Sequence, residues 1–95
     1  MTTYNDIEKR VIDLFLKYEP SLKNEVIKSE SRILEDMGLD SLSIHEISFD
    51  FEDEFDLTIS DNDIMDFKTI GDIVEFIVRE IGWWKKNRKE IEIWI

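Results

Sequence analysis

The sequence predicts an all-α fold, a small four-helix bundle with three longer helices and one short helix. Apolar residues recur at spacings of three and four along most of the chain, which is the helical period. Capping residues stand where the helical stretches begin. The 95 residues, 42% of them hydrophobic, are enough for one small domain with a modest core.

The first helix is expected to start at a Thr-x-x-Asp capping pattern formed by Thr3 and Asp6. Its apolar stripe consists of Ile7, Val11, Leu14, Phe15 and Tyr18. Pro20 ends this helix, because proline does not continue a helix.

Residues 21–36 form a long connection in this interpretation. The apolar residues expected to hold it against the core are Leu22, Val26, Ile33 and Leu34. Two helices joined by so long a link need not be simple antiparallel neighbours.

The second helix is predicted from about Ser41 to Phe55, with Asp40 as its N-cap after a tight turn containing Gly38. By helical spacing, its core face consists of Ile44, Ile47, Ser48, Phe51 and Phe55. Ser48 is the polar member of this face. Its hydroxyl can either bond back to a helical carbonyl or face a cavity.

The opposite face of the second helix is acidic, but it also carries apolar residues. Its members are Leu42, His45, Phe49 and Glu52, flanked by Glu46, Asp50 and Asp53. Phe49 has two interpretations: a partly covered surface aromatic, or a hydrophobic contact for a partner inside an acidic rim. His45 is interpreted as a plain surface residue.

Two further helices follow a loop over residues 56–60, in which Leu57 and Ile59 turn inward. Ser60 and Asp63 cap a short helix, and Phe67 is assigned to the core. Thr69 and Asp72 cap the last helix. Its stripe consists of Ile70, Ile73, Ile77 and Ile81, with Val74 and Val78 adjacent, and Gly82 is its natural stop.

Composition excludes several classes of function. The net charge of −11 argues against nucleic acid and favours partners with basic patches. The chain has no cysteine and a single histidine, so a metal site is not expected, and Asp61-Asn62-Asp63 lacks the glycine and distal glutamate of an EF-hand. No nucleophile–base pair is evident, so no catalytic residue is assigned. The sequence shows no membrane span and no signal-peptide pattern, which indicates a cytoplasmic protein.

Ser41 stands at the first position of the second helix. A helix start offers unpaired N–H groups and a partial positive charge, both of which favour a phosphate group. Asp-Ser-Leu by itself favours a plain helix-start serine, because short motifs recur by accident.

The residues around Ser41 carry more information than this tripeptide. The run Gly38-Leu39-Asp40-Ser41-Leu42, then Glu46, then the acidic Glu52-Asp53-Glu54-Phe55-Asp56, resembles the acyl carrier proteins. The likeness continues through residues 57–61 and 68–72 and covers roughly residues 7–81. The resemblance implies that Ser41 receives 4′-phosphopantetheine from coenzyme A, and that the thiol of this arm holds acyl groups as thioesters.

The resemblance also implies roles for neighbouring residues. Asp40 and Leu42 would support the cofactor site. The expected partner-binding residues are Glu46, Phe49, Glu52 and Asp53. Expected partners are a phosphopantetheinyl transferase and acyl-transfer or synthase enzymes of fatty-acid, polyketide-type or related biosynthesis. The protein would be a free-standing carrier and a monomer, not an enzyme.

The chain departs from the family pattern in three places. Ser48 lies on the core face of the second helix, where the family usually has an apolar residue. Ser43 replaces the acid that commonly follows Ser-Leu, which bears on the choice of transferase. Residues 83–95 form an atypical extension after a carrier domain over residues 1–82. This basic, Trp- and Ile-rich tail could pack on the carrier itself, shield the acidic second helix, dock a partner or form a dimer.

Two alternatives to an acyl carrier remain at this point. An aminoacyl or peptidyl carrier resembles the same fold. An acidic interaction module without a cofactor belongs to a different class, and it predicts that Ser41→Ala leaves partner binding unchanged.

Overall fold

The computed structural model describes residues 4–81. Its helices are α1 (Tyr4–Tyr18), α2 (Ser41–Phe55), α3 (Asp61–Met65) and a last helix over residues 70–81, with a 3-10 helix η1 (Pro20–Asn24) after α1. Within this range there is no strand, so the predicted small all-α bundle with three longer helices and one short helix is confirmed. The predicted cap at Thr3, the stop at Gly82 and the tail over residues 83–95 lie outside the described residues.

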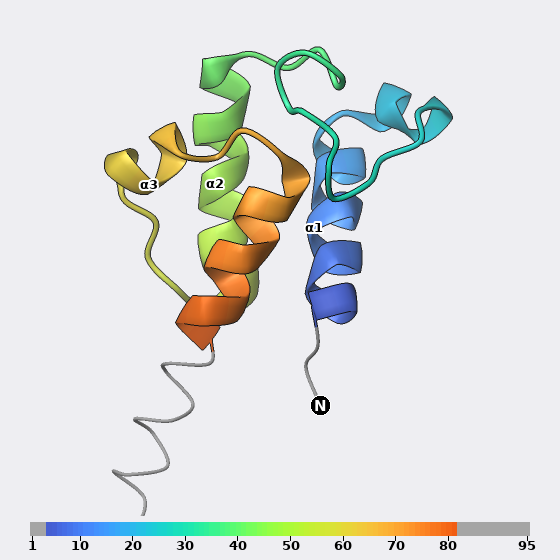
Figure 1. Cartoon of the computed structure of the whole chain (residues 1–95). Coiled ribbons are helices and arrows are strands. Elements are labelled where there is room, and N and C mark those ends of the chain that lie inside the picture. Colours follow the sequence, from blue (N-terminus) through green and yellow to red (C-terminus); the bar gives the residue numbers. More distant parts are fainter. Residues whose placement is uncertain (1–3, 82–95) are drawn as a thin grey trace, which may run out of the picture.

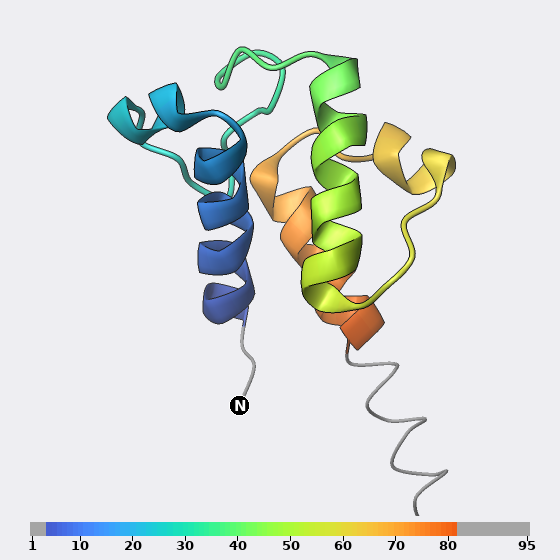
Figure 2. The same cartoon turned by 180° about the vertical axis from the view of Figure 1, so that it is seen from behind.

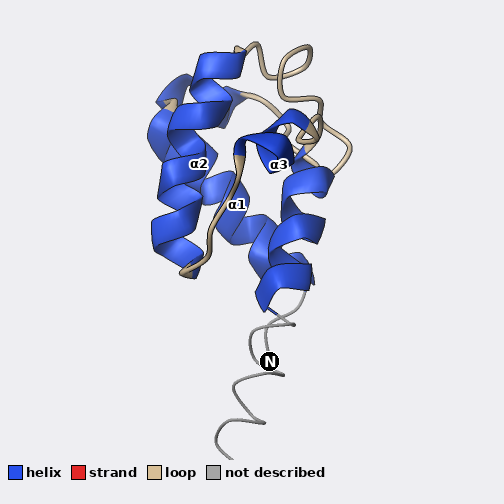
Figure 3. Ribbon diagram, turned by 90° about the vertical axis from the view of Figure 1, so that its left-hand side faces the viewer, coloured by secondary structure: helices blue, strands red, loops and turns tan. Residues whose placement is uncertain are grey.

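The three longer helices lie side by side (Figure 1). α1 and α2 contact each other and run in opposite directions, while the last helix runs in the same direction as α2. The reverse view shows the long connection crossing one end of the bundle, between the end of α1 and the start of α2 (Figure 2). The loop after α2 turns back along the bundle and places the short α3 beside the first half of α2 (Figure 3). α1 and α2 are therefore antiparallel neighbours despite the long connection between them.

The core forms where the predicted apolar faces meet. Its fully buried members include Ile7, Val11, Phe15, Ile47, Phe51, Ile70, Ile73, Val74 and Ile77. The rings of Phe15 and Phe51 join α1 to α2 with centroids 5.6 Å apart. Phe67 packs edge-on against Phe76 at 5.4 Å; Phe76 is a buried residue that the sequence stripe did not include. Aromatic pairs of this geometry stabilise a core beyond the area that they bury.

The long connection corrects one prediction. Leu22 and Ile33 are buried as expected, but Val26 and Leu34 are 79% and 50% exposed, so their assignment to the core is wrong. The connection is instead held by backbone hydrogen bonds, which do not depend on which side chains are apolar. Val26 and Leu34 therefore point outward at little cost, since single exposed apolar residues are common on protein surfaces.

These backbone bonds join the end of the connection to the start of the last helix. The N–H of Ile33 donates to the carbonyl of Lys68 at 2.9 Å, and the N–H groups of Ile70 and Gly71 donate to residues 31 and 29. Glycine suits this approach, because a Cβ at position 71 would lie 3.1 Å from the Ser29 carbonyl oxygen, a tight contact. The end of the connection is thus fixed to the start of the last helix.

The predicted caps on the two later helices are present. Ser60 and Asp63 form a reciprocal capping box at the start of α3. The Thr69 hydroxyl accepts from the Asp72 N–H at 3.2 Å, and the Asp72 carboxylate accepts from the N–H of Thr69 at 3.0 Å. These local contacts explain why both helices begin where the sequence predicts.

Candidate functional site: the start of α2 and the adjoining groove

Ser41 is the first residue of α2, and it is exposed. Asp40 caps the helix as predicted: its Oδ1 accepts from the Ser43 N–H at 2.8 Å. This bond, together with a contact from the Ser43 side chain, holds the pKa of the Asp40 carboxyl below its usual value. The cap stops the helix from extending backwards, so the Ser41 hydroxyl stands at a fixed and accessible helix end.

The approach to Ser41 is a tight turn. Gly38 has φ +69°, a left-handed conformation that glycine adopts without steric cost. The Leu39 N–H donates to the Ile33 carbonyl at 3.2 Å, and the neighbouring Met37 is buried. The turn is therefore tied to the connection and to the core on either side of Gly38.

An ionic network lies in the connection before this turn. Arg32 makes ion pairs with Glu35 and with Asp36, the latter at 3.1 Å. The hydrogen bonds from Arg32 hold the pKa of the Asp36 carboxyl below its usual value. This spacing of Arg32, Glu35 and Asp36 suits i,i+3 and i,i+4 pairing, a signal that sequence analysis could have used.

α1 also contacts the start of α2. The Tyr18 hydroxyl donates to Glu46 Oε2 at 2.6 Å across 28 positions of sequence. This hydrogen bond is the main cause that raises the pKa of Tyr18. The sequence pattern predicts Tyr18 on the core stripe and Glu46 on the partner surface, but it does not indicate that the two residues meet.

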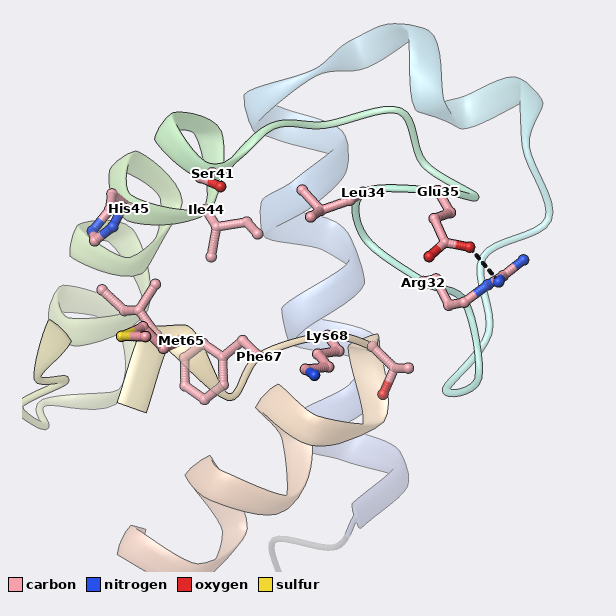
Figure 4. Close-up of a pocket in the computed structure, with 11 residues that line it drawn as sticks. Arg32, Leu34, Glu35, Ser41, Ile44, His45, Met65, Phe67 and Lys68 are labelled. Atoms are coloured by element: carbon pink, nitrogen blue, oxygen red, sulfur yellow. Dashed lines mark hydrogen bonds and ion pairs between the residues drawn. The ribbon is translucent and has the colours of Figure 1, made fainter. Parts of the chain in front are cut away.

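A groove of about 650 Å³ opens next to Ser41 (Figure 4). It lies between the start of α2, the α3 segment and the connection. Its lining residues are Arg32, Leu34, Glu35, Ser41, Ile44, His45, Ile64, Met65, Phe67, Lys68 and Thr69. Leu34, which sequence analysis assigned to the core, and Ile44 lie near Ser41 in this view. The groove therefore combines an apolar floor with charged residues, and its volume is within the range of small-molecule sites.

Ser48, the polar residue of the core face, does not line this groove. It is buried, and its hydroxyl donates to the Ile44 carbonyl at 2.7 Å. Of the two possibilities that the sequence left open, the structure shows the back-bonded hydroxyl.

The residues predicted to bind partners differ in their exposure and in the hydrogen bonds that they make. Leu42 and Phe49 are 65% and 67% exposed, and Asp53 is exposed nearby on the same helix. Glu46 is also exposed but holds the Tyr18 hydroxyl. Glu52 is partly buried, and its carboxylate accepts from the Ile59 N–H at 2.8 Å, which fixes the loop after α2.

In residues 4–81, no group of three or more His, Cys, Asp or Glu side chains is placed to hold a metal ion. None of the helices in that range is long and apolar enough to cross a membrane. An exposed serine at a capped helix start fits a covalently attached phosphate ester, because the first N–H groups of a helix are unpaired. The neighbouring groove offers room for a flexible arm.

Comparison with known proteins agrees with this geometry. Residues 19–77 match the family described as "Phosphopantetheine attachment site". The chain is 35% identical to the acyl carrier protein of Campylobacter lari over 77 residues, which are 81% of this chain and 94% of that protein. It is 40% identical to the acyl carrier protein of Borreliella burgdorferi over 60 residues, 63% of this chain and 75% of the relative.

Proposed function

Because the chain belongs to the acyl carrier protein family, and its cofactor is accordingly covalent 4′-phosphopantetheine, we propose that Ser41 is the attachment residue of a free-standing carrier. The observation that carries this assignment is the exposed Ser41 hydroxyl at the capped start of α2, beside the groove. When bound, the group supplies a thiol that holds an acyl group as a thioester. We assign no catalytic residue to the chain, which would act as the substrate of its client enzymes.

Ser41 is loaded by a phosphoryl-transfer step in this proposal. The Ser41 oxygen attacks the phosphorus of coenzyme A that bears the pantetheine arm. A new O–P bond forms and the pyrophosphate P–O bond breaks. Adenosine 3′,5′-bisphosphate leaves, and the serine proton passes to a base of the transferase. The chain's own contribution is to hold the hydroxyl exposed, with Asp40 and Leu42 on either side of it.

The outer face of α2 is the proposed docking surface for the transferase and for client enzymes. Leu42 and Phe49 supply exposed apolar contacts. Glu46 and Asp53, four and eleven residues after Leu42, lie on the same face of the helix and supply negative charge. Glu52 belongs to this surface as well, although its carboxylate also holds the loop after α2. Partners with basic patches should bind weakly and in a salt-dependent manner, because exposed ion pairs are screened.

Fatty-acid or polyketide-type synthesis is the proposed setting, and the cytoplasm remains the expected location. The acidity of α2 favours acyl or polyketide clients over those of an aminoacyl or peptidyl carrier. The carrier would work by tethering, since a flexible arm raises the local concentration of its cargo at each active site.

Intact-mass measurement after incubation with coenzyme A, magnesium and a broad-specificity phosphopantetheinyl transferase tests the attachment residue. We expect a gain of one phosphopantetheine in the natural chain and none in Ser41→Ala. Ser43→Ala is the matched control, because Ser43 lies two residues away in the same helical turn, and it should still be loaded. A modified Ser41→Ala chain would refute the assignment.

A further inference from the structure

We propose that the groove beside Ser41 accepts acyl chains that end in an anionic group, with the terminal carboxylate paired to Lys68. This inference rests on the proposed function and names the class of cargo that the groove would favour. Such a cargo has an apolar middle and a charged end.

The floor of the groove suits the apolar middle. Leu34, Ile44 and Phe67 line it together with Ile64 and Met65 from α3. In the close-up, Leu34 and Ile44 lie near Ser41, while Phe67 lies nearer to Lys68, on the other side of the groove (Figure 4). An acyl chain that lies along this groove would therefore cover apolar surface before its end reaches Lys68.

Lys68 is the cation that this groove leaves uncompensated. Arg32 also lines the groove, but its charge is balanced by ion pairs with Glu35 and Asp36. The nearby Asp72 carboxylate is occupied at the helix cap, where it accepts from the backbone N–H of Lys68 at 3.1 Å. The Lys68 ammonium makes no ion pair with another residue in the described part of the chain.

The surroundings make this one charge significant. Residues 33–67 contain twelve acidic residues and no Lys or Arg, in a chain with a net charge of −11. A carboxylate on the cargo would be repelled over most of this surface and attracted at Lys68. His45 also lines the groove. A cargo that ends in a methyl group gains nothing from Lys68.

Two cargoes of equal length test the proposal. The carrier is loaded with hexanoyl- or adipoyl-phosphopantetheine from the matching coenzyme A thioester. The two groups differ in a terminal methyl or carboxylate. The readouts are cleavage of the thioester by hydroxylamine, which is slower when the cargo is shielded, and NMR shifts of the groove residues Leu34, Ile44 and Met65.

In the natural chain, adipoyl cargo should be cleaved about two- to five-fold more slowly than hexanoyl cargo, the range expected for an exposed ion pair. Lys68→Met keeps an apolar stem but removes the charge, so it should abolish the difference. Lys23→Met is the matched control, because Lys23 is exposed and does not line the groove. It should leave the difference intact, and high salt should reduce it.

Three results would overturn the proposal. Hexanoyl cargo could be shielded as well as adipoyl cargo, or the adipoyl advantage could survive in Lys68→Met. In the third, adipoyl cargo would change the shifts of Leu34, Ile44 and Met65 no more than hexanoyl cargo does, which would show that the terminal carboxylate does not enter the groove. Mass measurement separates these from a failure of the attachment at Ser41, which would appear as no loading before any cargo is compared.

Discussion

Replacing Ser48 by alanine should change the free energy of unfolding by no more than about 0.5 kcal/mol, although the residue is buried in the core. The hydroxyl donates to the Ile44 carbonyl at 2.7 Å, and such a bond contributes about 1 kcal/mol net. Alanine regains about 0.5 kcal/mol through its higher helix propensity. The Ile44 carbonyl keeps the helical N–H of residue 48 as a partner, so the substitution leaves no buried group unpaired.

Urea unfolding followed by far-UV circular dichroism measures this change, and a loss of 0.5 kcal/mol lowers Tm by about 2–4 °C. Ile47→Val is the control, because the neighbouring Ile47 is fully buried and loss of one methyl group costs about 0.5–1.5 kcal/mol. If Ser48→Ala costs more than about 1.5 kcal/mol, the hydroxyl satisfies a buried group in some other way, and the reasoning from the back-bonded geometry is refuted.

Three further predictions concern charge. The Ser43 N–H holds the pKa of Asp40 below its usual value of about 3.9. The ionised carboxylate therefore stabilises the fold above that pH, and this contribution is lost as the pH falls through the folded-state pKa. Stability measured over about pH 2–7 should therefore fall less in Asp40→Asn than in the natural chain, and parallel curves would contradict this. The hydrogen bond to Glu46 raises the pKa of Tyr18, so Glu46→Gln should let the Tyr18 phenolate form at lower pH in an absorbance titration; an unchanged midpoint would count against that bond. The hypothesis that residues 83–95 shield α2 predicts tighter partner binding at low salt after their deletion, and it fails if affinity and its salt dependence stay the same.

Sequence patterns predicted the contacts that depend on nearby residues. The N-cap at Asp40 is confirmed, as are the bounds of α2 and the capping pairs of the two later helices. These features follow from spacings of three and four residues, which are visible in the chain itself. The buried face of α2 follows from the same period.

The remaining features depend on parts of the chain that are distant in sequence. The bond between Tyr18 and Glu46 needs the end of α1 to meet the start of α2, which no local pattern indicates. Leu34 was expected in the core because it is apolar, yet it lines an open groove, since backbone bonds and not side chains hold the connection in place. The groove could not be predicted, because three separate segments build it.

The bonds between residues 29–33 and 68–71 affect how the molecule opens. They join the two ends of the segment that carries Ser41, α2 and α3, so these ends should not separate while the last helix stays folded. Amide hydrogens in such a joint exchange with solvent only when the whole cooperative unit opens. The N–H groups of Ile33, Ile70 and Gly71 should therefore exchange as slowly as those of the core, even though Ile33 lies in a connection. The segment that carries Ser41 would then move as a closed loop whose two ends stay joined.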